Sequence, residues 1–185
     1  MRADAAQRRE TILRQARHLF AERGRDVALE TIAAASGVGI ATLYRNFSSR
    51  EELVRAVVDD MVQEILTIVA AARTTADKDP AEAWKGLLGA LTDMELGALT
   101  DVLGLESPQD SHAVFAAIQQ PALDALDELL IVLQHEKAVR TGLTALDVVV
   151  AVATITRLQV PAIREAAPGV PEQLAEAYLL WSRAG

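Results

Sequence analysis

The sequence predicts an all-α protein of about nine helices, and three observations support that prediction. Apolar residues make up 51% of the 185 residues and aromatic residues only 4%, so the core must be built from Ala, Leu, Val and Ile. This composition favours helices packed on helices. Apolar residues also recur at helical spacing along most of the chain, and Gly and Pro stand where helices would end and begin.

Three helices are expected within the first 47 residues. The first ends at Gly24 and carries an apolar stripe: Ile12, Leu13, Ala16, Leu19 and Phe20. The second is short and ends at Gly37; its apolar residues are Leu29, Ile32 and Ala33. The third is marked by Leu43, Tyr44 and Phe47.

Start signals define the next two helices. Ser48 with Glu51, and Ser49 with Glu52, form two overlapping capping-box patterns, and the apolar stripe that follows predicts a long helix to about residue 73. Residues 74–79 are predicted to be a linker. Another helix then begins with Asp79 as the cap, Pro80 at the first position and Glu82 three residues after the cap. The glycines at 86, 89 and 97 predict a bend, or space for a neighbour or ligand.

Proline and threonine set the predicted boundaries of the remaining helices. A stop at Gly104 and a start at Ser107-Pro108 come first. Pro121 is predicted to break or kink the preceding helix, because it lacks an N–H and its ring clashes with the preceding turn, and the helix is divided there. A β-branched run within 141–158 is compatible with a buried strand. No comparable second strand exists, and Thr144 with Asp147 forms a cap, so a helix is predicted. Pro171 opens the last helix.

Composition excludes several classes of protein. The chain has no Cys, which rules out disulfides, thiolate metal sites and cysteine nucleophiles. Its polar, charged first nine residues do not resemble a signal peptide. The longest apolar run, Val148–Ile155, is too short to cross a bilayer. We therefore expect a soluble, cytoplasmic protein that does not interact with a membrane.

Charge is distributed unevenly along the chain. The net charge is −8, which taken alone argues against binding to nucleic acid. Residues 1–55, however, hold ten arginines against seven acidic residues, whereas the remainder holds eight basic against nineteen acidic residues. A basic segment joined to an acidic body is typical of a protein that meets a polyanion at one end, although chance clustering on solvated helix faces explains it equally well.

The second and third helices form a helix-turn-helix pattern. The turn "SGVG" requires Gly37 in the left-handed conformation, with Val38 filling the corner. At about 100° per residue, one side of the third helix holds the scaffold residues Ile40, Leu43, Tyr44 and Phe47. The other side holds Ala41, Thr42, Arg45 and Asn46, and this small, polar, basic surface suits the major groove of DNA.

The block "ETIAAASGVGIATLYRNFSSREELVRAVV" resembles the DNA-binding domain of the tetracycline-repressor (TetR) family. The family pattern is G-V-x-x-x-T-L-Y-x-x-F, and all its fixed positions are present: Gly37, Val38, Thr42, Leu43, Tyr44 and Phe47. The resemblance covers about the first third of the chain. It implies a DNA-binding domain at residues 1–50 and an effector-binding and dimerisation domain of divergent helices at residues 51–185.

The resemblance also implies roles for individual residues. Thr42 and Arg45 would reach base edges or adjoining phosphates, with Gly39, Ile40 and Asn46 alongside. The Tyr44 hydroxyl would bind one phosphate. Arg50 would bind another, and its position at a helix N-terminus favours an anion independently of the resemblance. Departures from the family are Ala28, where a capping Ser or Thr is common, and Ile40 and Ala41, which cannot donate a hydrogen bond to a base.

No other constellation indicates chemistry. The three histidines, His18, His112 and His135, lack metal-ligand spacing, so no metal or cofactor is expected. The acidic pairs Asp59-Asp60 and Asp93/Glu95 have no nucleophile nearby and are interpreted as parts of solvated helix faces. We therefore do not expect this protein to be an enzyme. Candidate lining residues for an effector pocket are Trp84, Met94 and Phe115, although ordinary core packing is the commoner role of such residues.

The sequence and the resemblance together predict a homodimeric transcriptional repressor. It would bind a palindromic operator in double-stranded DNA and be released by an unknown small-molecule effector. The most apolar late helices would form a four-helix bundle across the two-fold axis. The residues predicted to line this interface are Val152, Ile155, Leu174, Tyr178 and Trp181. The alternative is a helical ligand- or protein-binding module of the same fold without DNA-binding activity.

Overall fold

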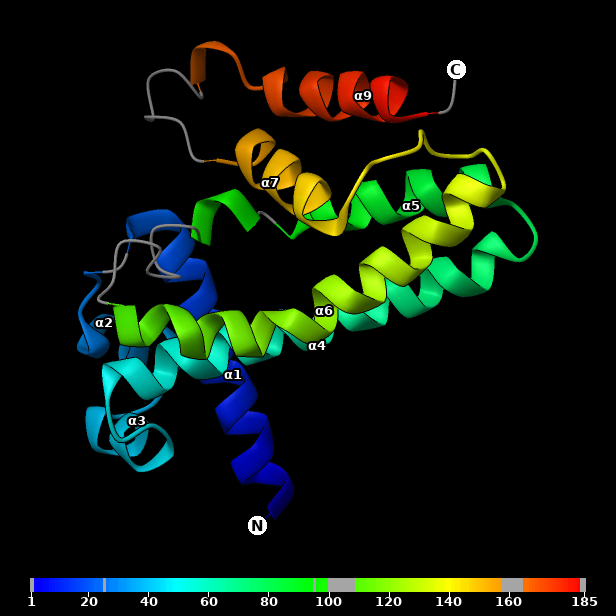
Figure 1. The fold of residues 1–185 in the computed structure, drawn as a ribbon. Helices are drawn as coiled ribbons and strands as arrows, with labels where there is room; N and C mark the ends of the chain where they lie inside the picture. The colour runs from blue at the N-terminus through cyan, green and yellow to red at the C-terminus, as the bar shows by residue number, and fades with distance from the viewer. Residues whose placement is uncertain (1, 25, 95, 100–108, 158–164, 184–185) are drawn as a thin grey trace. The chain divides into compact units, whose positions relative to one another are not determined.

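The computed structural model describes residues 2–24, 26–94, 96–99, 109–157 and 165–183, which form eight α-helices, one short 3-10 helix and no strand (Figure 1). The all-α prediction is confirmed. Nowhere in these described ranges is a helix both long and apolar enough to cross a membrane. Two compact units are distinguished: Met1–Met61 with Ala98–Ile118, and Val62–Gly97 with Gln119–Gly185. The predicted domain limits, 1–50 and 51–185, stay a prediction.

The first unit is built on the N-terminal helices. Their bounds are α1 (Arg2–Arg23), α2 (Leu29–Ala35), α3 (Ile40–Asn46) and the beginning of α4 (Arg50–Ala76). Helix α2 contacts both α1 and α3. The predicted apolar stripes form the core, whose largest fully buried side chains are Ile12, Phe20, Ile32, Leu43, Phe47 and Leu53. Gly24 ends α1 with a φ of +77°, as the sequence predicts.

The second unit contains the rest of α4 and the later helices. These are α5 (Pro80–Asp93), the start of η1 (Leu96–Leu99), most of α6 (Gln109–His135), α7 (Ala145–Ile155) and α9 (Val170–Ser182). Helices α5, α7 and α9 contact one another. Trp84 is fully buried, and its Nε1 donates a hydrogen bond of 2.9 Å to the Oγ of buried Ser182, which joins α5 to the last residue of α9.

The predicted caps of this unit are confirmed. The Glu82 N–H donates to Asp79 Oδ1 at 2.9 Å, and Pro80 lies in the first turn of α5. Thr144 and Asp147 form a reciprocal capping box at the start of α7, which is a helix and not a strand. Hydrogen bonds from the Thr144 side chain and backbone hold the pKa of Asp147 below its usual value.

Two predicted boundaries are wrong. Pro121 lies inside a continuous α6, because buried apolar residues on the same helix, such as Leu126 and Leu130, supply packing that outweighs one lost backbone hydrogen bond. Helix α4 runs to Ala76, into the predicted linker 74–79, since Ala76 is buried and the hydroxyls of Thr74 and Thr75 donate to carbonyls one turn earlier. The predicted stop at Gly104 and start at Ser107-Pro108 lie outside the described residues.

Candidate nucleic-acid interface

The turn between α2 and α3 has the geometry that the sequence requires. Gly37 has a φ of +68°, the left-handed conformation that glycine adopts without a steric penalty. The Val38 N–H donates to the Ala33 carbonyl at 3.0 Å, and the Ser36 hydroxyl donates to the Ile32 carbonyl at 2.7 Å. These bonds close the end of α2 and fix the direction in which α3 leaves the turn.

Helix α3 divides into a buried side and an exposed side. Leu43 and Phe47 are fully buried, whereas Arg45 and Tyr44 are exposed. Tyr44 is 48% exposed, so the prediction that it shares the scaffold side with Leu43 is wrong. The only fully buried residue within the seven-residue α3 is Leu43, and Tyr44, one residue on, is turned about 100° away from it; buried Phe47 follows the helix in an extended conformation.

The other predicted DNA-contact residues of this region are Gly39, Ile40, Thr42 and Asn46, and they differ in exposure. Gly39 is exposed and forms the N-cap of α3, with φ −73° and ψ 152°. Ile40, Thr42 and Asn46 are partly exposed. The DNA-contact roles of these residues stay predictions.

Hydrogen bonds within α3 order its exposed polar side chains. Arg45 Nη2 donates to Thr42 Oγ1 at 2.7 Å, and Asn46 Nδ2 donates to the Thr42 carbonyl at 2.8 Å. Thr42 therefore accepts one hydrogen bond from the side chain of Arg45 and one from that of Asn46. The Arg45 guanidinium has five N–H donors in a rigid fork, so this one bond leaves it with further donors for a base edge or a phosphate.

Arg50 opens α4 and reaches back to an earlier segment. Its Nη2 donates to the Val27 carbonyl at 2.8 Å, a bond that ties the start of α4 to the segment before α2. The sequence pattern did not indicate this bond, because it joins residues 23 positions apart. Its predicted phosphate contact stays a prediction.

The cap of α4 follows the predicted frame of Ser49 with Glu52, and Ser48 bonds to the same glutamate. The Glu52 N–H donates to Ser49 Oγ at 3.2 Å, while the Ser48 backbone N–H and hydroxyl both donate to Glu52 Oε2, at 2.7 and 2.6 Å. The hydrogen bonds from the Ser48 side chain and backbone, with smaller contributions from Arg9 and Arg55, hold the pKa of Glu52 below its usual value. Glu52 therefore stays ionised and orders the loop between α3 and α4.

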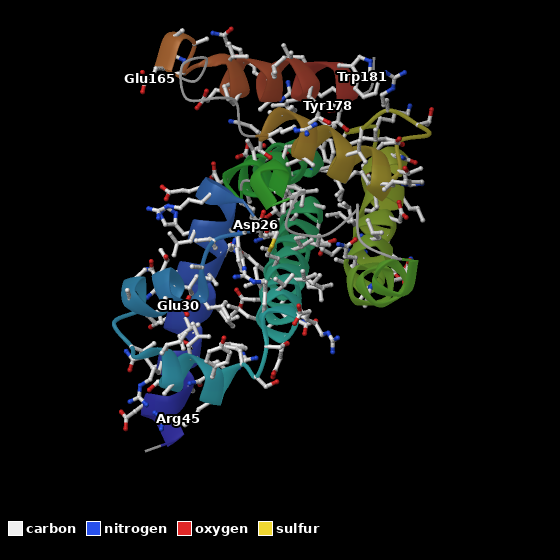
Figure 2. The ribbon with its side chains drawn as sticks, turned by 90° about the vertical axis from the view of Figure 1, so that its left-hand side faces the viewer. Asp26, Glu30, Arg45, Glu165, Tyr178 and Trp181 are labelled. Atoms are coloured by element: carbon white, nitrogen blue, oxygen red, sulfur yellow. The ribbon has the colours of Figure 1, made fainter. Side chains whose placement is uncertain are left out.

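A shallow, open hollow of about 580 Å³ lies beside this loop. It brings together the two predicted phosphate-contact residues, Tyr44 and Arg50. Its lining residues are Asp26, Ala28, Leu29, Glu30, Tyr44, Ser48, Ser49 and Arg50. Figure 2 shows Asp26, Glu30 and Arg45 along this side of the unit.

The hollow also contains features that the sequence reasoning missed or only partly foresaw. Ala28 is the N-cap of α2 and makes no side-chain hydrogen bond. The alanine that stands where the family commonly has Ser or Thr therefore leaves α2 without a side-chain cap. The sequence reasoning did not single out the carboxylates of Asp26 and Glu30, and only their position on either side of the α2 cap could have indicated them. An anion in this hollow would meet both a guanidinium and two carboxylates.

Two of the three candidate pocket residues pack in the core of the second unit. Trp84 is fully buried and Met94 is 5% exposed, as core residues are. The side chain of Phe115 lies outside the described side chains. A separate groove of about 290 Å³ lies between α4 and α5, and neither Trp84 nor Met94 lines it. Its lining residues are Ile68, Ala71, Ala72, Thr75, Glu82, Ala83, Gly86, Leu87 and Ala90.

The candidate dimer residues lie on α7 and α9 and differ in exposure. Leu174 and Trp181 are 49% and 55% exposed, whereas Ile155 and Tyr178 are partly buried. Val152 is only 1% exposed and packs inside its own unit, so it has no surface to offer a partner. Four further exposed apolar residues on these helices were not predicted: Leu146, Val150, Val170 and Leu180.

An aromatic cluster lies at the end of α9 (Figure 2). The rings of Tyr178 and Trp181 are stacked with centroids 5.6 Å apart, and the Arg140 guanidinium lies 4.2 Å from the centroid of the Trp181 ring. The Tyr178 hydroxyl is buried and has no hydrogen-bond partner in the described part of the chain. Burial, and then the charge of Asp147, raise the pKa of Tyr178 to about 12.

A family model and solved structures both relate this chain to bacterial transcriptional regulators. Residues 12–57 match the family model of bacterial regulatory proteins, tetR family. The whole chain is similar to the TetR transcription regulatory protein from Mycobacterium vanbaalenii, with 28% identity, 98% of each chain covered and a TM-score of 0.64. A TetR transcriptional regulator from Streptomyces coelicolor shows 28% identity over 95% of this chain and 98% of that chain, with a TM-score of 0.67.

A more distant structure shares the fold alone. It is the fatty acid degradation regulator FadR from Bacillus halodurans, which is 17% identical over 94% of this chain and 93% of that chain, with a TM-score of 0.69. Among curated proteins, none matches the chain.

Proposed function

Since the chain belongs to the TetR family of bacterial regulatory proteins and carries its DNA-binding helix-turn-helix, we propose that it is a cytoplasmic repressor that binds a palindromic operator as a homodimer. A small-molecule effector would release it from DNA. The observation that carries the proposal is the exposed side of α3, where Thr42 and Arg45 are joined by a hydrogen bond of 2.7 Å and lie opposite a fully buried scaffold.

The polar side of α3 supports direct contact with base edges. Arginine is the commonest residue to bind guanine in the major groove, through two parallel hydrogen bonds. The neighbouring residues Ile40 and Ala41 cannot form hydrogen bonds to base edges through their side chains. They offer only apolar surface, which suits a thymine methyl group. Arg45 is therefore the residue on which we expect base recognition to depend most.

The exposed apolar residues of α7 and α9 support a homodimer. Leu146, Val150, Leu174 and Leu180 are each about half exposed or more, and such a set on two neighbouring helices is typical of an interface. A helix-turn-helix dimer places its two recognition helices about one DNA turn apart. An effector that binds one spacing of the recognition helices more tightly than another would weaken operator binding by that difference in affinity.

Arg45→Ala is expected to weaken operator binding by about 1–3 kcal/mol and to relax the base preference at one position of each half-site. The operator is first selected from random duplexes with the purified protein. Affinity is then measured by gel shift at two salt concentrations. Lys85→Ala is the matched control, because Lys85 is also exposed and cationic but lies on α5 in the second unit.

Equal binding by wild type and Arg45→Ala would overturn the assignment of Arg45. Failure of the wild type to select any DNA at either salt concentration would overturn the repressor proposal itself. The chain would then be the alternative, a helical ligand- or protein-binding module of the same fold.

Leu174→Glu is expected to raise the dimer dissociation constant about tenfold or more, because an unpaired carboxylate buried at an interface costs about 1–3 kcal/mol. The matched control is Gln173→Glu, which introduces the same charge at the adjacent exposed position. Sedimentation equilibrium over a range of protein concentrations gives both constants. A wild-type chain that is monomeric at micromolar concentration would contradict the homodimer.

A further inference from the structure

Helix α3 is short, and few buried side chains fix its direction. It contains seven residues, of which only Leu43 is fully buried, and buried Phe47 follows it in an extended conformation with φ −141° and ψ 109°. A helix of this length is not stable by itself in water, so packing determines where it lies. The contacts of Leu43 and Phe47 therefore decide how accurately the exposed side of α3 is presented.

A cation from α1 covers the ring of Phe47. The Arg9 guanidinium lies 4.9 Å from the centroid of this ring. A guanidinium at such a distance is attracted by the negative face of an aromatic ring. Arg9 is itself exposed, whereas the Phe47 side chain has no exposed surface. Arg9 therefore forms an outer layer over the residue that ends α3.

Arg9 also acts on the loop that follows Phe47. The Ser48 backbone N–H and hydroxyl donate to Glu52 Oε2 at 2.7 and 2.6 Å. These two hydrogen bonds are the main cause of the lowered pKa of Glu52, and the positive charges of Arg9 and Arg55 lower it further. One side chain of α1 thus interacts with the end of α3 and with the carboxylate that orders the next loop.

The contact depends on position 9 and not on the charge of the segment. Arg8 is exposed and cationic like Arg9, but a step of one residue turns it about 100° round the helix. Both figures show this half of α1 at the same end of the first unit as α3. Arg8 therefore offers a matched control for any effect of Arg9.

We propose that Arg9 is a positioning residue for DNA recognition, which holds Phe47 and the loop after it and so fixes the direction of α3 without touching DNA. This inference rests on the proposed function. A protein binds its ligand with an affinity reduced by the fraction of molecules in the competent conformation. Arg45 lies two residues before Phe47, so a shift at the end of α3 would displace it, and Arg9 raises the competent fraction.

The first measurement is amide hydrogen exchange by NMR on the free protein. Arg9→Ala is expected to speed exchange at Phe47 and Ser48 by about two- to fivefold, the factor that one exposed cation–π contact supplies. The control amide is that of Ser36, which donates to the Ile32 carbonyl at the end of α2 in the same unit. It should exchange as in wild type, and Arg8→Ala should change none of the three amides.

The second measurement is the affinity for the selected operator at two salt concentrations. Arg9→Ala is expected to weaken binding by about two- to fivefold. The slope of log K against log salt should stay unchanged, because a residue that does not touch DNA releases no counterions from it. Arg9→Lys should restore most of the binding, since it keeps a cation over the ring. Arg8→Ala removes the same charge from the same helix and should bind like wild type.

Three results would overturn this inference alone. Exchange at Phe47 and Ser48 that is unchanged in Arg9→Ala would show that Arg9 does not hold the end of α3. Equal acceleration at Ser36 would show a general loss of stability. A salt slope reduced by about 0.9 would show that Arg9 binds a phosphate itself.

The failure of this inference is distinguishable from the failure of the proposed function. In each of those three cases Arg45→Ala would still lose affinity, and the proposed function would stand. If wild type selects no DNA, the proposed function fails, and the exchange experiment still decides whether Arg9 fixes the end of α3.

Discussion

Trp84→Ala is expected to lower the free energy of unfolding by about 3–5 kcal/mol, the usual cost of removing a buried tryptophan side chain. Trp84 is fully buried on α5, and its indole N–H donates to Ser182 at the end of α9. The substitution leaves a cavity and also removes the donor to a buried hydroxyl. Urea denaturation at one fixed protein concentration measures the change, because the stability of a dimer depends on concentration.

Lys85→Ala is the control for this substitution, since Lys85 is the next residue of α5 and is exposed. Its effect should lie within about 0.5 kcal/mol of zero. If Trp84→Ala were as stable as wild type, the placement of Trp84 in the core would be wrong and the earlier interpretation as a pocket residue would regain support.

Gly97→Ala is expected to destabilise the second unit by about 1–3 kcal/mol through overpacking. A Cβ at this position would overlap the Ala153 carbonyl oxygen and the Arg157 amide nitrogen, which are backbone atoms and cannot rotate away. The Gly97 N–H also donates to Thr156 Oγ1 at 2.8 Å, and a displaced backbone would stretch this bond. The midpoint of thermal unfolding should fall accordingly.

Gly86→Ala provides the matched control, because the same methyl group is added where nothing lies within 4 Å. Within a helix this substitution should stabilise the protein by about 0.5–1 kcal/mol. The two substitutions should therefore move the unfolding midpoint in opposite directions. A common direction would contradict the packing of η1 against α7.

Local chemistry made much of the fold predictable from the sequence. Gly37 adopts the left-handed conformation that its place in the turn requires, and the caps at Asp79 and Thr144 form as the spacing of their partners indicates. Each of these features depends on residues within a few positions, so a pattern in the sequence is sufficient. The buried stripe of α1 was predictable for the same reason.

Features that depend on tertiary packing were harder to predict. Pro121 remains in a helix because of what the neighbouring turns of α6 bury, which the local rule for proline does not include. Periodicity placed Tyr44 on the scaffold side, although the stripe that α3 buries is narrower than half of the helix. Val152 was chosen for its apolar character, which does not distinguish a core position from an interface.

Long-range hydrogen bonds could not be predicted from the sequence at all. The bond from Arg50 to the Val27 carbonyl joins residues 23 positions apart, and the bond from Trp84 to Ser182 joins residues 98 positions apart. No periodicity or cap motif relates such residues. The candidate site was therefore predictable where α3 itself supplies the residues, and not where α4 reaches the segment before α2.

The hydrogen bond between Arg45 and Thr42 has a consequence for the thermodynamics of DNA recognition. A free arginine side chain samples many rotamers and loses up to about 2 kcal/mol of rotamer entropy when it is fixed. An arginine already held by a threonine one turn earlier has lost part of that freedom on folding. If Arg45 binds a base as proposed, less of the entropic cost remains to oppose binding, so Thr42 would add to the affinity through its bond to Arg45.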